Sequence, residues 1–111
     1  MRIGVAATDA SLDAEVCEQF GRCRYLVIVD SETLAIEAFP NPGNGMPSGA
    51  GPTAVQELVN RGAEAVLAGE FGPKAEQTLT AAGLRFDKVH GMVSEAISAW
   101  TCYVPDGKET L

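Results

Sequence analysis

The sequence is short of positive charge. Its 111 residues hold eight Lys and Arg against fifteen Asp and Glu, which gives a net charge of −7. A surface that binds nucleic acid regardless of sequence needs clustered Lys and Arg to displace counterions from phosphates. The basic residues of this chain are few and scattered. We therefore expect no nucleic-acid partner.

Long apolar runs and a secretory signal are also missing. No window approaches the roughly 20 apolar residues that a membrane-spanning helix requires. The first five residues lead directly into a strand-like run, without the charged, apolar and cleavage regions of a signal peptide. We expect a cytoplasmic protein with no membrane partner.

Cysteine is sparse, and its spacing matches no common motif. Three cysteines are an odd number, which fits free thiols better than a disulfide framework. Cys17 and Cys23 have five residues between them, which is neither a Cys-x-x-Cys redox pair nor a recognised zinc or ferredoxin spacing. Two interpretations stay open for this pair: the cysteines are small apolar residues of the core, or they are soft ligands of a metal. Cys102 is expected to be a buried or idle thiol, far from the other two.

The hydrophobic patterns predict one α/β domain over residues 1–104, followed by a frayed tail at 105–111. Strands are expected at 3–7, 25–30, 34–39, 65–68 and 84–89, and helices at 52–61, from Pro73 to before Gly83, and around 93–100. We expect a single sheet core of Ile3, Val5, Val27, Val66, Leu67 and Phe86, covered by Val55, Leu58, Leu79, Ile97 and Trp100.

The order of these elements predicts where a ligand would bind. Strand–helix–strand units place the third, fourth and fifth strands parallel, and a hairpin makes the second antiparallel. If the first strand is parallel to those three, the carboxyl ends of four strands share one rim, where ligands bind in open α/β sheets. That rim collects the connections 8–24, 40–51, 69–72 and 90–91.

A glycine-rich turn at this rim opens a helix, from Ser48 to Thr53. Free backbone N–H groups at the positive end of a helix dipole can hold an anion, although such turns are often only loops. Arg22 could clamp an anionic ligand or pair with a surface acid. His90 could be a ligand or a surface histidine.

Short motifs resemble a known family: Phe20-Gly21-Arg22, Gly49-Ala50-Gly51, the run 62–69, Gly72-Pro73, Ala82-Gly83-Leu84 and Glu95-Ala96-Ile97. In this order and spacing they are similar to the nitrogenase iron–molybdenum cofactor biosynthesis and binding proteins. The resemblance covers roughly residues 3–100. It implies a three-layer α/β/α ribonuclease-H-like fold, with a mixed five-stranded sheet ordered 3-2-1-4-5 and strand two antiparallel.

The resemblance also implies a function, which is to bind or carry an iron–molybdenum or other metal–sulfur cluster rather than to catalyse a reaction. A cluster-assembly or acceptor protein is the expected partner. Histidine is common in the family at the positions of Gln19 and Ser48, so Cys17 and Cys23 are the expected metal ligands here. The expected cofactor-binding residues are Gln19, Phe20, Gly21, Arg22, Ser48, Gly49, Ala50, Gly51, Gly69 and His90.

Other function classes fit the sequence less well. A two-metal nuclease needs several carboxylates on adjacent strands, and the apolar run 3–7 offers none. Thiol redox chemistry favours a Cys-x-x-Cys pair, which is absent. The main alternative is a small anion-binding or protein-interaction regulatory module, which would use the glycine-rich turn and no thiols.

Overall fold

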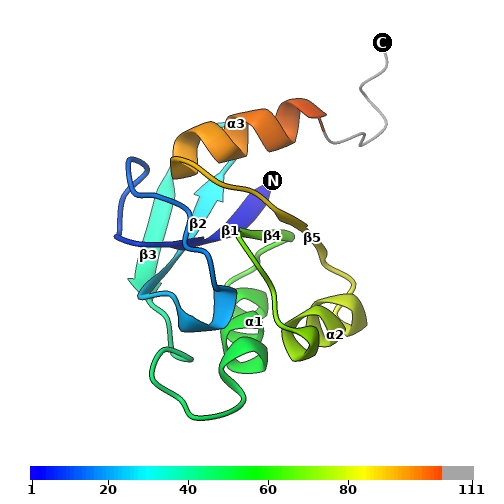
Figure 1. Ribbon diagram of the computed structural model, residues 1–111. Helices are drawn as coiled ribbons and strands as arrows, with labels where there is room; N and C mark the ends of the chain where they lie inside the picture. Colours follow the sequence, from blue (N-terminus) through cyan, green and yellow to red (C-terminus); the bar gives the residue numbers. More distant parts are fainter. Residues whose placement is uncertain (104–111) are drawn as a thin grey trace.

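The computed structural model describes residues 1–103 as a mixed five-stranded sheet with helices on both faces (Figure 1). The tail predicted at 105–111 and the domain end predicted at 104 lie outside the described residues. The elements in chain order are β1 (Arg2–Ala7), η1 (Phe20–Arg22), β2 (Tyr25–Asp30), β3 (Ile36–Pro40), α1 (Ala50–Asn60), β4 (Ala65–Ala68), α2 (Pro73–Ala81), β5 (Arg85–Lys88) and α3 (Val93–Tyr103).

The strands lie in the order β3-β2-β1-β4-β5, as predicted. β1 pairs in parallel with β4, and β4 with β5. β2 is antiparallel to both β1 and β3. The carboxyl ends of β1, β3, β4 and β5 therefore lie at one rim, and the loops that follow these strands meet there.

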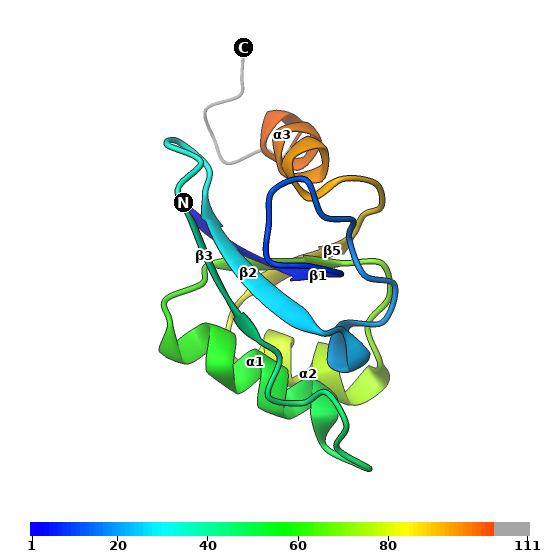
Figure 2. The same ribbon diagram turned by 90° about the vertical axis from the view of Figure 1, so that its left-hand side faces the viewer.

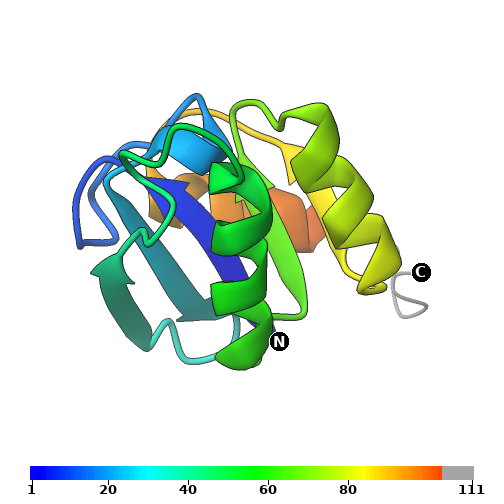
Figure 3. The same cartoon turned by 90° about the horizontal axis from the view of Figure 1, so that it is seen from below.

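Helices cover the two faces unequally: α1 and α2 lie side by side on one face, and α3 lies alone on the other (Figures 2 and 3). None of the helices described within residues 1–103 is both long and apolar enough to cross a membrane.

The prediction of a single core is wrong, because the sheet separates two. Side chains alternate along a strand, so neighbouring residues face opposite helical layers. Ile3 and Leu67 pack under α3, whereas Ala6 and Val66 pack under α1 and α2. Of the predicted covering residues, Val55, Leu58 and Leu79 belong to one core, and Ile97 and Trp100 belong to the other.

Helix α1 begins at Ala50, two residues before the predicted start at Pro52. Gly49 precedes it with φ of 75°, a left-handed conformation that glycine adopts without steric cost. Pro52 falls within the first turn, where backbone N–H groups have no partner inside the helix and a missing one costs nothing. The chain thus enters α1 through backbone geometry, with no side-chain cap.

Leu58 of α1 is fully buried and packs directly on the centre of β1, where a Cβ built on Gly4 would lie 2.8 Å from its Cδ2 atom. We expect Leu58→Ala to lower the free energy of unfolding by about 2 to 5 kcal/mol, because it leaves a cavity in the core. The neighbouring Val59 is 38% exposed, so Val59→Ala should cost only about 0.5 kcal/mol. Urea melts of both variants test this, and equal losses would contradict the packing.

Candidate functional site

Backbone hydrogen bonds hold the long connection from β1 to β2 along the rim of the sheet. Gly69 donates its N–H to the Cys17 carbonyl at 3.0 Å, and Phe20 donates to the Glu70 carbonyl at 3.0 Å. Gln19 and Glu70 form an isolated parallel bridge. The turn η1, which carries the Phe-Gly-Arg motif, is thereby held beside the end of β4.

A pocket of about 580 Å³ opens at this rim, between η1 and the starts of α1 and α2. Eight of the predicted binding residues line it together: Gln19, Phe20, Gly21, Arg22, Ser48, Gly49, Ala50 and Gly51. The other side is lined by residues of the β4–α2 connection and the first turn of α2, Glu70 to Ala75. The sequence places the connection 69–72 at this rim, but it did not indicate that the first turn of α2, with Lys74 and Ala75, also lines the pocket.

Three backbones come unusually close at one wall of the pocket. A Cβ on Gly21 would lie 3.0 Å from the Gly51 nitrogen, and a Cβ on Gly51 would lie 2.9 Å from the Ala75 Cβ. Both distances are shorter than an ordinary contact between carbon and another heavy atom. Glycine at 21 and 51 therefore allows η1, α1 and α2 to meet.

Positive potential gathers at the pocket from four sources. Helices α1 and α2 both begin there, and neither has a side-chain cap on its first N–H groups. Each helix start carries the equivalent of about half a positive charge. Arg22 and Lys74 add two full charges. An anion in this pocket would meet unsatisfied N–H donors and opposite charge at the same time.

Acidic groups line the pocket as well. Glu18 and Glu70 are both exposed, and Glu70 forms an ion pair with Lys88 at 3.6 Å. A second pocket of about 480 Å³ shares these two glutamates and contains the predicted residues Gly69 and His90. Gly69 and His90 therefore line this second, adjoining pocket and not the first.

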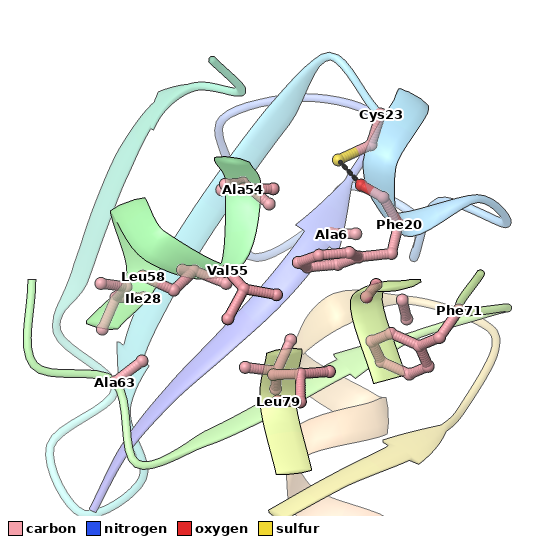
Figure 4. Close-up of a cluster of buried hydrophobic side chains, with 14 of the residues drawn as sticks. Ala6, Phe20, Cys23, Ile28, Ala54, Val55, Leu58, Ala63, Phe71 and Leu79 are labelled. Carbon is pink, nitrogen blue, oxygen red and sulfur yellow. Dashed lines mark hydrogen bonds between the residues drawn. The ribbon is translucent and has the colours of Figure 1, made fainter. Parts of the chain in front are cut away.

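The two cysteines of the rim line neither pocket. Cys17 is partly exposed, whereas Cys23 is only 1% exposed and its thiol lies inside the core under α1 and α2 (Figure 4). The Cys23 Sγ atom is 3.2 Å from the carbonyl oxygens of Phe20 and Tyr25. Burial, and next the nearby Cys17, raise the pKa of the Cys23 thiol to about 12.

A complete set of protein ligands for a metal ion is missing from the described part of the chain. No group of three or more His, Cys, Asp or Glu side chains there could hold one. Cys102 lies in α3, but its side chain is outside the described residues.

Comparisons with known proteins identify one family. The sequence model of the family described as "Dinitrogenase iron-molybdenum cofactor" matches residues 1–102. A search of curated proteins finds no match.

Solved structures of similar fold agree with that match. The apo form of the orange protein from Desulfovibrio gigas is 38% identical over 90% of this chain and 86% of its own, with a TM-score of 0.85. A Thermotoga protein of the DUF35 family is 34% identical over 90% and 86%, with a TM-score of 0.77. A protein from Methanocaldococcus jannaschii, at 11% identity over 89% of both chains and a TM-score of 0.58, shares the fold.

The buried thiol allows a direct test of the site. A thiolate is the form that reacts with iodoacetamide, and a pKa of about 12 leaves about one Cys23 in ten thousand ionised at pH 8. In a Cys102→Ser background, we expect Cys23 to be alkylated at least about 100-fold more slowly in folded protein than in urea. Because the folded pKa is raised, the rate should keep rising about tenfold per pH unit beyond pH 9.

Peptide mapping by mass spectrometry separates the two sites, and partly exposed Cys17 is the internal control for reagent access. Equal alkylation of Cys23 in folded and unfolded protein would contradict its placement.

Proposed function

The chain belongs to the dinitrogenase iron-molybdenum cofactor family, and from that premise we propose that it binds and carries a preassembled, anionic iron–molybdenum or other metal–sulfur cluster. The cluster is cargo, held in the pocket between η1 and the starts of α1 and α2. The observation that carries this proposal is that two uncapped helix starts, Arg22 and Lys74 converge on one pocket.

Charge and N–H donors are the proposed means of holding the cluster. A sulfide-rich cluster keeps negative charge, and its sulfur atoms accept hydrogen bonds from backbone N–H groups. The N–H groups of the first turns of α1 and α2 have no partner inside their helices and are available for this purpose. Phe20 and Phe71 both line the pocket and pack together at 5.3 Å between ring centroids, which gives it an apolar floor.

The predicted ligands Cys17 and Cys23 take a smaller part in this proposal. The Cys23 thiol is 1% exposed and lies in the core under α1 and α2, so a cluster in the pocket does not reach it. Cys17 is the partly exposed thiol of the two, but it does not line the pocket either.

A carrier also fits the chemistry better than an enzyme. No histidine or cysteine is among the residues that line the pocket, so it lacks the Ser–His and Cys–His pairs of many hydrolases. We keep the cytoplasm as the proposed location, a cluster-assembly or acceptor protein as the proposed partner, and ribonuclease-H-like as the proposed name of the fold.

An anion-binding regulatory module remains the second candidate, because the pocket is built from N–H groups and cations without a thiol at its lining. Molybdate and tetrathiomolybdate are dianions of the same shape that differ in oxygen or sulfur. A cluster carrier should prefer the sulfur anion, because its larger, softer sulfur atoms suit the apolar floor. A simple anion site should prefer molybdate or show no preference.

Reconstitution with iron, molybdate and sulfide under anaerobic conditions tests the proposed function. Wild-type protein should retain metal after gel filtration and show a visible charge-transfer band. We expect the Arg22→Gln/Lys74→Gln variant to bind the cluster about tenfold more weakly. It loses two charges near the ligand, and each contributes about 1 kcal/mol or less to binding.

Arg85→Gln is the matched control. It removes one exposed positive charge from the first residue of β5, at the opposite rim of the sheet, and should bind as wild type does. Cys23→Ser should also stay near wild type. A wild-type protein that retains no metal would overturn the carrier function, and full retention by Arg22→Gln/Lys74→Gln would overturn the pocket.

A further inference from the structure

Asn41 is the buried polar side chain of the described residues, with only 4% of its surface exposed. It follows directly after β3, in the connection that leads to α1. A buried carboxamide costs free energy unless its donors and acceptor are paired, so its partners show what it does.

The partners lie in the segment 20–23 and in the loop of Asn41 itself. The Nδ2 atom of Asn41 donates to the Cys23 carbonyl at 3.0 Å and to the Cys23 Sγ at 3.2 Å. The Phe20 and Gly21 carbonyls lie slightly farther from it, at 3.4 and 3.5 Å. The Oδ1 atom accepts from the Gly43 N–H at 2.9 Å. These partners fix the orientation of the amide, because acceptors surround its nitrogen and a donor faces its oxygen.

Backbone hydrogen bonds of Asn41 connect the same two segments. Its N–H donates to the Arg24 carbonyl at 2.9 Å, and its carbonyl accepts from Asn44 at 3.1 Å. Asn41 therefore joins the segment 20–24, which carries Arg22, to the loop that ends at the start of α1.

That loop is packed against α1 with little room to move. A Cβ on Gly43 would lie 2.3 Å from the Ala50 carbonyl oxygen, so the backbone at 43 lies directly against the first residue of α1. From the other side, the Arg22 guanidinium donates to the Met46 carbonyl at 2.9 Å. A shift of Gly43 would move both the helix start and the acceptor that orients Arg22.

We propose that Asn41 is a positioning residue of the cluster pocket, which holds the Arg22 turn at a set distance from the N-terminus of α1. This inference rests on the proposed function and adds a residue that does not line the pocket. Asn41 acts through Arg22 and the helix start, whose charges must act on the same anion.

The test uses tetrathiomolybdate as the probe and its dissociation constant as the readout. Asn41→Leu removes the donors and the acceptor while keeping a branched side chain, and it should weaken binding at least about tenfold. Val29→Ala is the matched control: Val29 is fully buried in the core under α3, so this variant should lose stability in urea and still bind as wild type does. If Asn41→Leu does not fold, the dissociation constant is measured for Asn41→Ser, which is smaller and keeps one donor. This variant should also bind the probe more weakly than wild type does.

A double-mutant cycle separates positioning from general stability. Because Asn41 acts partly through Arg22 and partly through the start of α1, adding Asn41→Leu to Arg22→Gln should weaken binding by only about threefold further, less than the loss that Asn41→Leu causes alone. Wild-type affinity in both Asn41 variants, or a loss that adds in full to that of Arg22→Gln, would overturn the inference while the proposed function stands. A wild-type protein that does not bind the probe would overturn the proposed function and this inference with it.

Discussion

The arrangement of the site depends on the close approach of three backbones at Gly51. Because Gly21 and Gly51 have no Cβ, the turn η1 lies against α1, and α1 lies against Ala75 at the first turn of α2. The two helix starts therefore open toward the same pocket instead of diverging. A larger side chain at either glycine would separate the segments and divide the positive potential that they share.

The helix ends at this pocket are left without side-chain caps, which is a loss of stability that ligand binding can offset. Most helix starts use a Ser, Thr, Asp or Asn side chain to pair the first N–H groups. Here glycines precede both α1 and α2, so the N–H groups stay free and the backbone leaves room for a ligand. The large buried side chains elsewhere supply the stability, in separate cores on the two faces of the sheet.

Much of the fold could be predicted from the sequence, because short buried strands and amphipathic helices leave strong patterns in one chain. The sheet order 3-2-1-4-5 followed from the resemblance and is confirmed. The convergence of loops at one rim followed from strand direction. Three details have no such pattern. The spacing of Cys17 and Cys23 does not tell which way the Cys23 thiol points. The proposed roles of Lys74 and Asn41 depend on tertiary contacts. The alternation of side chains along a strand does not tell which face of the sheet each helix covers.

The central claim is that the anionic cargo lies between the starts of α1 and α2. Anomalous X-ray scattering at the molybdenum absorption edge, from crystals of protein loaded with tetrathiomolybdate, tests it most directly because it locates the metal itself. We predict one anomalous peak within the pocket, close to Arg22 and the N–H groups of Ala50 and Gly51. A peak beside His90 in the neighbouring pocket, or at Cys17 outside both pockets, would contradict the account.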